Sequence, residues 1–369
     1  MDLGNLAYLL KKSGYRVAFA NVFKEKQLIK EDGIDIIPLK FKCPKFLLKK
    51  TKHSGVINFI YRFLSSLYLI YAVLALKNKA ENFYIGSLTL GTPIIWLMFL
   101  SPKKNYFLWG LRCHMLELWK KSHSLYGFYS KCLFCIVSRK KNIKIIVSHP
   151  IIKEEFTSRL NIESNRIIIR PERFIRGNVQ LRNKIKNEGL TLLTIGTLRR
   201  SKHVENIIDA LRQMNDSCIK YIIAGRCKND IAYESMLNEK VKGLNGIDRR
   251  NRFIPEEEYE ALMQSCDFMV LCDEQEASCA TNGTMAEALL HGMPIIAPDY
   301  NPFKYEVETL NIGILYDINS VDSIINALYK AKNDTQDKYY QGINQYMTDN
   351  ADNKIVLQLK EQLRDVLDK

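Results

Sequence analysis

This 369-residue chain lacks a cysteine pattern that would favour disulfides or metal binding. The nine cysteines are an odd number and lie mostly in apolar segments. Cys132 and Cys135 form a lone Cys-x-x-Cys, with no second pair at the spacing of zinc ligands. We therefore expect reduced cysteines in a cytosolic protein, without a metal or redox site.

Also missing is a long hydrophobic run free of charged residues, glycine and proline. Val56–Leu76 carries Asn58 and Arg62, and Phe83–Leu100 is interrupted by two glycines and a proline. A membrane-spanning helix needs about 20 apolar residues with few charges. We interpret both stretches as buried helix and strand segments, with an interfacial helix in the basic half as the alternative. No apolar run follows Met1, so we expect no secretory signal.

Three common motifs of nucleotide chemistry are absent. The chain has no P-loop and no Gly-x-Gly-x-x-Gly, which argues against nucleotide triphosphatases and dehydrogenases. It also has no Asp-x-Asp, the acidic pair that commonly holds a divalent cation on a diphosphate. If a diphosphate binds, we expect lysine, arginine and helix N-termini to neutralise it, with no metal and no other cofactor.

Negative charge is scarce in the first half of the chain. Residues 1–170 hold 29 Lys and Arg against 10 Asp and Glu, whereas the remaining residues hold 25 against 30. The net charges are therefore +19 and −5, which together give the +14 of the whole chain. This asymmetry indicates that one domain meets an anionic partner. Acidic lipid headgroups, lipid-linked phosphates and nucleic acid are the candidates.

The order of predicted elements in the first half is that of an α/β domain. Apolar residues at helical spacing predict a first amphipathic helix that ends at Ser13-Gly14. Strands are then expected at Tyr15–Phe19, Ile34–Pro38, Phe83–Ile85, Tyr106–Trp109 and Ile143–Ser148. No strand precedes the first helix, so we expect that the first strand of this domain is missing.

The second half predicts a doubly wound parallel sheet, because strands and helices alternate. Its strands are expected at Leu190–Ile195, Tyr221–Ala224, Asp267–Cys272, Pro294–Ala297 and Gly313–Tyr316. Its helices are expected after Val204 and at Glu256–Cys266, Gly283–His291, Val321–Ala331 and Asn353–Leu367. The polar segment Pro171–Lys184 is interpreted as the linker, which gives domains at 1–170 and 171–350 and a final helix in 351–369.

The first candidate site is the basic turn Gly196–Lys202, directly after a buried strand. Carboxyl ends of strands in open α/β sheets border the ligand, and helix N-termini there offer free N–H groups. Arg199, Arg200 and Lys202 give this turn three cations, which suits a diphosphate. A solvated basic loop is the alternative, and in either case we expect Lys202 on an exposed turn.

The second candidate site runs from Asp273 to Glu287, from a strand end into a helix. Asn282, Gly283 and Thr284 place small and polar residues at the helix start, where backbone N–H groups can surround a phosphate oxygen. The Glu287 carboxylate, one turn further, could accept hydrogen bonds from ribose hydroxyls. The structural alternative is a capping box, because Thr284-x-x-Glu287 fits that pattern as well.

With these residues in place, the stretch Leu190–Tyr316 resembles the donor domain of the family-four glycosyltransferases, the glycosyl transferases group 1. The resemblance rests on four segments in the family's order: LLTIGTLRRSKHVENIIDAL, YIIAG, FIPEEEYEALMQSCDFMVL and TNGTMAEALLHGMPIIAPD. It implies the GT-B fold, in which two Rossmann-like domains face a cleft and a C-terminal helix crosses back to the first domain. It also implies transfer with retention of anomeric configuration.

By position, the resemblance assigns roles to five residues. Lys202 matches the family's diphosphate lysine and is the expected catalytic cation. Glu287 matches the signature glutamate that holds the ribose. The diphosphate contacts at the helix start match Asn282, Gly283 and Thr284.

The basic loop departs from the family at one position. The family often has arginine directly after the loop glycine, where this chain has Thr197. We expect Arg199 or Arg200 to take over its contact with the diphosphate.

The donor-sugar loop departs as well. The glutamate that usually meets the sugar would lie eight residues before Glu287, where this chain has Cys279. Glu274 or Glu276 is the expected replacement, from a reshaped loop.

The N-terminal half resembles the family only through GNLAYLLKKSGYRVAFA, its first helix and second strand. By position, His114 could correspond to a catalytic-cleft histidine, and a structural histidine is the alternative. This domain is expected to bind the acceptor.

The predicted activity is that of a hexosyltransferase-type glycosyltransferase that uses a nucleotide-diphosphate sugar. A saccharide acceptor, polyprenyl-linked, suits the basic first domain, which points to bacterial surface polysaccharide synthesis. The expected location is the cytoplasm, peripheral at the anionic inner face of the membrane, without nucleic acid as a partner. The alternatives are an inactive or truncated homologue and a basic module that binds membranes or nucleic acid.

Overall fold

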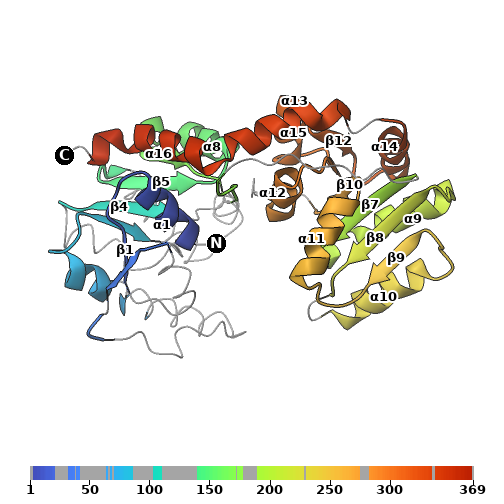
Figure 1. Cartoon of the computed structure of the whole chain (residues 1–369), viewed down its shortest axis with the longest axis horizontal. Coiled ribbons are helices and arrows are strands. Elements are labelled where there is room, and N and C mark those ends of the chain that lie inside the picture. Colours follow the sequence, from blue (N-terminus) through green and yellow to red (C-terminus); the bar gives the residue numbers. More distant parts are fainter. Residues whose placement is uncertain are drawn as a thin grey trace. The chain divides into compact units, whose positions relative to one another are not determined.

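The computed structural model describes residues 3–20, 32–37, 39–41, 64, 67–68, 70–85, 103–109, 139–171, 173–177, 189–227, 230–274, 282–334 and 337–367. Contacts divide the chain into two compact units, coloured from blue to red along the sequence in Figure 1. The first unit holds Met1–Glu172 and Asn353–Lys369, and the second holds Arg173–Glu276 and Ala280–Asp352.

The first unit is built on parallel strands. Its larger sheet has the order β3 (Asn82–Ile85), β4 (Asn105–Trp109), β5 (Ile143–Val147) and β6 (Ile167–Ile169). A separate parallel pair joins β1 (Ala18–Ala20) to β2 (Asp35–Ile37). Helices α1 (Leu3–Lys12) and α8 (Pro150–Leu160) belong to the same unit. Tyr106 and Ile143, from adjacent strands, are fully buried in the core beneath the sheet.

The last helix, α16 (Asp352–Leu367), belongs to the first unit from Asn353 onward, although it follows the second unit in sequence. The side-chain oxygen of Gln362 accepts a hydrogen bond of 2.8 Å from the backbone N–H of Ile169, on β6. Leu359 and Leu363 lie on the apolar face of the helix and are buried. The expected return of the C-terminal helix to the first domain is confirmed.

The second unit contains one six-stranded, fully parallel sheet. Its strands are β7 (Leu190–Ile195), β8 (Ile219–Ala224), β9 (Ile247–Arg250), β10 (Phe268–Val270), β11 (Ile295–Pro298) and β12 (Gly313–Tyr316), in the order β12-β11-β10-β7-β8-β9. Its helices are α9 (Val204–Met214), α10 (Ile231–Val241), α11 (Glu256–Ser265), α12 (Gly283–Leu290), α13 (Phe303–Leu310), α14 (Val321–Asn333) and α15 (Asp337–Asp349).

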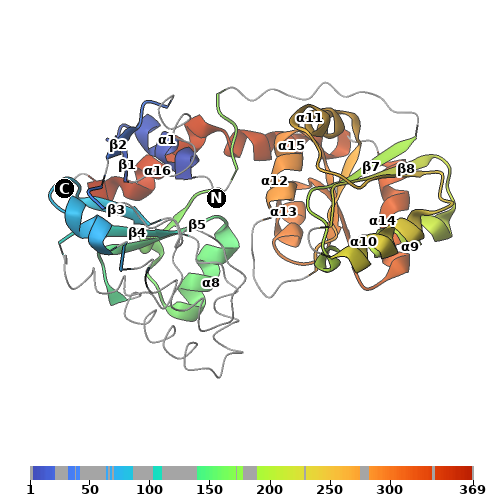
Figure 2. The ribbon, with the colours of Figure 1, turned by 90° about the horizontal axis from the view of Figure 1, so that it is seen from below.

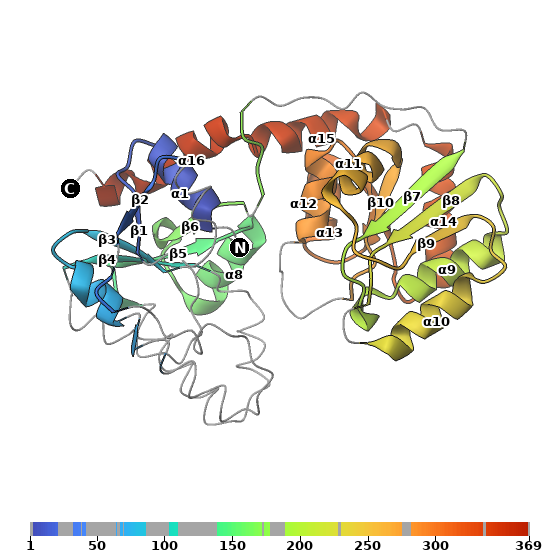
Figure 3. The same ribbon diagram turned by 60° about the horizontal axis from the view of Figure 1, so that its bottom comes forward.

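Helices cover both faces of this sheet, so its central strands are apolar on both sides. Helix α9 packs against α10 and α14, while α15 packs against α12 and α13. Figure 2 and Figure 3 show these two groups of helices on opposite faces. The sheet is therefore doubly wound, as the sequence predicts.

The strand order reverses at the centre of the sheet. The first strand, β7, lies between β8 and β10, so successive strands add outward on one side and then on the other. In such sheets, ligands bind beyond the carboxyl ends of the strands at this switch point. The fold therefore predicts a ligand site at the residues that follow β7 and β10.

The predicted strands and helices of the second unit are present, and β7 and β12 have the expected bounds. In the first unit, the strand expected at Tyr15–Phe19 is wrong in position, because β1 begins at Ala18. The backbone before β1 is still completing the helix end, where the N–H of Tyr15 donates to Leu10 and Gly14 has a left-handed φ of 97°.

Among the α-helices and strands that the structure describes, the sequence analysis missed α8, β6, β9, α10, α13 and α15. Two of them carried a readable signal at their start. Pro150 occupies the first helical position of α8, a common place for proline. Asp230 caps α10, because its carboxylate accepts a 3.0 Å hydrogen bond from the N–H of Tyr233.

The described residues include no helix with the length and apolarity needed to cross a bilayer. The cysteines in this part of the chain, at positions 218, 227, 266 and 272, are free thiols.

Candidate functional site

Two glycines shape the turn that follows β7. Gly196 has a φ of 111°, and Gly225, directly after β8, has a φ of 131°. A Cβ on Gly225 would lie 1.9 Å from the carbonyl oxygen of Gly196, so only glycine fits there. In the described part of the chain, no atom lies within 4 Å of the place where Gly196 would carry a Cβ. The backbone of the turn at Gly196 is thus not covered on that side by any described atom.

The basic turn continues into a short 3₁₀ helix, Arg200–Lys202. Arg200 is engaged in a bidentate contact with Asp230, at 2.8 and 3.1 Å. That hydrogen bonding holds the pKa of Asp230 below its ordinary value. Arg199 is exposed and makes no ion pair with the described residues. Of the two expected substitutes for an arginine at Thr197, Arg199 is thus the available one.

Lys202 is buried, which contradicts the expectation of an exposed turn: only 8% of its surface is accessible. The 3₁₀ turn and His203, with a left-handed φ of 44°, bring this segment against the end of β10. There the N–H of Glu274 donates to the carbonyl of Ser201 over 2.5 Å. No carboxylate of the described residues lies within ion-pair distance of the Lys202 ammonium.

The surroundings of Cys272 locate this ammonium. Burial raises the pKa of the Cys272 thiol to about 12, and the nearby charge of Lys202 acts in the opposite direction. Cys272 follows β10 by two residues and is itself buried. Lys202 therefore extends from the turn after β7 toward the end of β10, at the switch point of the sheet.

Asp273 connects the end of β10 to the start of α12. Its carboxylate accepts a 2.9 Å hydrogen bond from the side-chain amide of Asn282, and its carbonyl accepts one from the hydroxyl of Tyr300. Glu274 is exposed, with its carboxylate 3.9 Å from Nε2 of His203. The carboxylate of Glu205 lies 3.6 Å from the other ring nitrogen of His203.

Asn282 is the N-cap of α12. Its side-chain oxygen accepts hydrogen bonds from the N–H groups of Thr284 and Met285, at 2.9 and 3.1 Å. Thr284 is therefore the second residue of the helix and not its cap, so the capping-box alternative is wrong. The reason is that Asn282, two residues earlier, is the stronger cap. The Asn282 side chain is engaged by Asp273 as well as by the helix start, whereas no atom of the described residues lies within 4 Å of the place where Gly283 would carry a Cβ.

Glu287 lies on α12, beyond its first turn, where its partner is an arginine. Nε of Arg173 lies 3.1 Å from the Glu287 carboxylate, and the side chains are 51% and 25% exposed. The charge of Glu287 also helps to raise the pKa of Tyr259 to about 12, after burial as the larger cause. A carboxylate has about four lone-pair sites, so Glu287 keeps capacity to accept further hydrogen bonds beside its contact with Arg173.

Two predicted site residues, His114 and Glu276, lie outside the described residues. The remaining ones, Arg199, Lys202, Glu274, Asn282, Gly283, Thr284 and Glu287, all belong to the second unit. They follow β7 and β10, so the fold gathers them at one edge of one sheet. No group of three His, Cys, Asp or Glu suited to a metal ion occurs in the described part of the chain.

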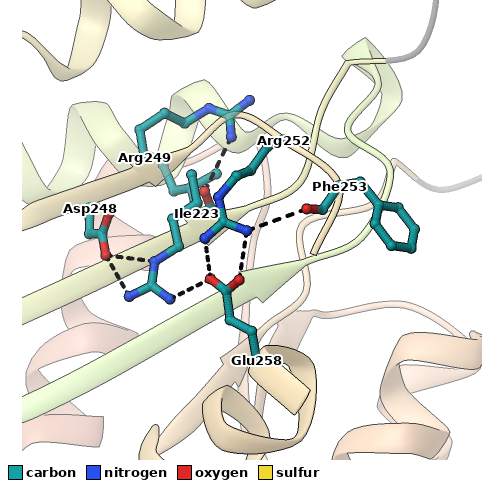
Figure 4. Close-up of polar contacts among 7 residues, drawn as sticks. Ile223, Asp248, Arg249, Arg252, Phe253 and Glu258 are labelled. Atoms are coloured by element: carbon teal, nitrogen blue, oxygen red, sulfur yellow. Dashed lines mark hydrogen bonds and ion pairs between the residues drawn. The ribbon is translucent and has the colours of Figure 1, made fainter. Parts of the chain in front are cut away.

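Two arginines at the same edge escaped the sequence analysis. Arg226 follows β8 and is exposed. Arg249, on β9, donates from Nη1 to the carbonyl of Ile223 (Figure 4), at 3.2 Å. The same nitrogen donates to the carbonyl of Gly225, at 2.5 Å. Burial lowers the pKa of Arg249. The signal for Arg226 was available, since it lies just beyond a predicted strand, whereas the strand that carries Arg249 was itself not predicted.

The loop between β9 and α11 is held by ion pairs between two arginines and Glu258. Arg252 binds the Glu258 carboxylate with both terminal nitrogens, at 2.6 and 2.7 Å, as Figure 4 shows. Arg250 adds a third contact to the same carboxylate at 2.8 Å. Glu258 thereby ties the end of β9 to the first turn of α11.

One family model matches most of the second unit. Residues 178–351 match the model of the family described as glycosyl transferases group 1. None of the curated protein sequences matches the chain.

Solved structures agree over nearly the whole chain. Sucrose-phosphate synthase from Thermosynechococcus elongatus has a TM-score of 0.68 at 14% identity, covering 99% of this chain and 92% of its own. Anabaena HepE, solved in complex with UDP, has a TM-score of 0.66 at 14% identity, covering 99% and 97%. WaaG, a glycosyltransferase involved in lipopolysaccharide biosynthesis, has a TM-score of 0.61 at 15% identity, covering 98% and 95%. The expected GT-B fold and the family resemblance are both confirmed.

Proposed function

Since residues 178–351 are a domain of the glycosyl transferases group 1, we propose that the chain transfers a sugar from a nucleotide-diphosphate donor to a saccharide acceptor. The donor binds the second unit, at the carboxyl ends of β7 and β10. The acceptor binds the basic first unit. Retention of the anomeric configuration and transfer of a hexose are parts of this proposal.

The main support for this proposed activity is the burial of Lys202. A buried ammonium is costly to desolvate, and no described carboxylate pairs with it. Such a cation at the switch point of a doubly wound sheet favours an anionic ligand. A diphosphate supplies the missing counter-charge.

The chemistry follows from the position of this charge. As the acceptor hydroxyl attacks the anomeric carbon, the glycosidic bond to the diphosphate breaks, and negative charge grows on the departing nucleoside diphosphate. The Lys202 ammonium, Arg199 and the N-terminus of α12 at Gly283 stabilise that charge. These groups need no metal ion for this task, and we propose that none takes part.

The remaining contacts to the donor come from α12 and the loop before it. The Glu287 carboxylate accepts hydrogen bonds from the ribose hydroxyls, with Arg173 holding it in place. Thr284 contributes its hydroxyl to the diphosphate. Glu274 meets the sugar, because it leads from β10 into the loop where the family's usual glutamate is replaced by Cys279.

The acceptor half of the proposal rests on charge and exposed apolar surface. Residues 1–170 carry the net charge of +19. Phe41, Leu64 and Leu67 in this unit are 63%, 37% and 44% exposed, and Nζ of Lys40 lies 5.8 Å from the centre of the Phe41 ring. Aromatic and aliphatic groups beside lysine suit the interface of an anionic membrane. We therefore favour a polyprenyl-linked saccharide at the inner face of the cell membrane, in surface polysaccharide synthesis.

A panel of nucleotide sugars, read by thermal shift and then by release of nucleoside diphosphate, tests the proposal. One donor should raise the melting temperature of the parent protein and be turned over with a lipid-linked saccharide. Lys202→Ala should lose turnover, and Lys220→Ala, an exposed lysine on β8, should keep it. Binding of a donor without turnover by any acceptor would favour an inactive homologue, and binding of none would refute the proposal.

A further inference from the structure

The pairing of β7 with β8 continues beyond the two strands. Within the sheet, Ile195 is the register partner of Ala224. Further on, Leu198 pairs with Cys227, and the N–H of Leu198 donates to the carbonyl of Arg226 over 3.1 Å. The intervening residues keep the same register, so Arg226 lies opposite Thr197.

Burial alternates in step along both segments. Leu198 and Cys227 are buried, at 0% and 8% exposure, whereas Thr197 and Arg226 are exposed. Register partners on parallel strands place their side chains on the same side of the sheet. Arg226 therefore extends from the same side of the sheet as Thr197.

Arg226 makes no ion pair with the described residues, unlike Arg200 with its Asp230 partner. The peptide before it is held by Arg249, whose Nη1 donates to the carbonyl of Gly225 over 2.5 Å. Nη2 of Arg249 donates to the side chain of Asn251 at 3.1 Å. The guanidinium of Arg249 thus holds the peptide between Gly225 and Arg226 and places a second positive charge close to this peptide.

We infer that Arg226, which extends from the end of β8, binds the donor diphosphate in addition to Arg199 and Lys202. This inference rests on the proposed function, since it assigns a further residue to the same donor site. Lys202 approaches the diphosphate from the β10 side, and Arg226 approaches it from the β8 side. A planar guanidinium in this position can contact two phosphate oxygens at once.

The test compares uridine, adenosine and guanosine diphosphates with their nucleosides by calorimetric titration. Arg226→Ala should weaken the binding of the preferred nucleoside diphosphate by about ten- to hundredfold and leave the nucleoside alone. Arg212→Ala removes an equal charge from the last turn of α9 and should change neither. Thr197→Arg added to Arg226→Ala should restore most of the lost affinity, because the new arginine occupies the register partner of position 226.

The outcomes of these titrations distinguish a failure of the proposed function from a failure of the role assigned to Arg226. A parent protein that binds none of the diphosphates would remove the proposed function together with this inference. Normal diphosphate binding by Arg226→Ala, at an unchanged melting temperature, would overturn the inference and leave the function standing. Equal losses for nucleoside and diphosphate would also overturn it, since they would reveal a general change of the site.

Discussion

At the scale of single residues, Lys202 shows how a functional charge can act against stability. The ammonium is buried without a described carboxylate partner, so the folded protein bears a desolvation cost that a ligand would offset. Lys202→Met keeps the length of the side chain and removes the charge. The ligand-free variant should melt no lower than the parent, whereas turnover should fall about a hundredfold or more. Melting curves and initial rates, with Lys220→Met as the exposed control, would measure both. A clear drop in melting temperature would instead assign a structural role to the ammonium.

Glu287 allows a matched comparison, because its ion pair with Arg173 can be broken from either side. If the carboxylate holds the ribose, Glu287→Gln should weaken donor binding by roughly 1.5–3 kcal/mol, or about ten- to hundredfold. Arg173→Ala should cost far less, since an ion pair with a half-exposed arginine contributes about 0–1 kcal/mol. Donor titrations of both variants decide the question. Equal effects would show that Glu287 acts through the ion pair alone.

At the scale of elements, the sequence predicts best where burial is continuous. Five of the six residues of β7 are buried, and its apolar run gave the bounds correctly. The strand β9, with the sequence Ile-Asp-Arg-Arg, lies at the edge of the sheet and is partly exposed, so neither alternation nor an apolar run marks it. Helix α10 was missed because its apolar residues do not gather on one face, and packing against α9 determines it instead.

The candidate site was predictable to a similar degree. Its loops could be placed because carboxyl ends of neighbouring parallel strands meet at one edge. The burial of Lys202 could not be predicted from the sequence, because it depends on the left-handed turn at His203 and on the contact of this segment with the end of β10. Nor could the capping by Asn282 be separated from a capping box at Thr284, since both patterns fit the same letters.

The ion pairs that Glu258 forms between β9 and α11 should make the stability of the fold depend on pH. Hydrogen bonds from Arg252, assisted by Arg250, hold the pKa of Glu258 below its ordinary value of 4.5. A carboxylate with a lowered pKa in the folded state stabilises the protein above its unfolded pKa and loses that effect as pH falls through the folded one. Glu258→Gln should therefore melt below the parent at neutral pH, and the two curves should converge under acid conditions. Glu257→Gln, in the same helical turn, is the control. A constant offset down to the acid limit would rule out the charge as the cause.

At the scale of the whole molecule, the uneven charge leads to a prediction about membranes. Residues 1–170 carry +19 against −5 for the rest, and the first unit exposes Phe41 and Leu67. The full-length protein should therefore bind phosphatidylglycerol vesicles well and phosphatidylcholine vesicles poorly. Since salt screens surface charge over roughly 8–10 Å at physiological strength, binding should weaken as salt rises. Phe41→Ser with Leu67→Ser should reduce binding by removing the apolar contribution, while Ile231→Ser, an exposed apolar residue of the second unit, should not. Vesicle flotation over a salt series measures all of these. Equal binding to neutral and anionic vesicles would contradict the prediction. Tight DNA binding that survives physiological salt would indicate that the basic surface binds nucleic acid instead.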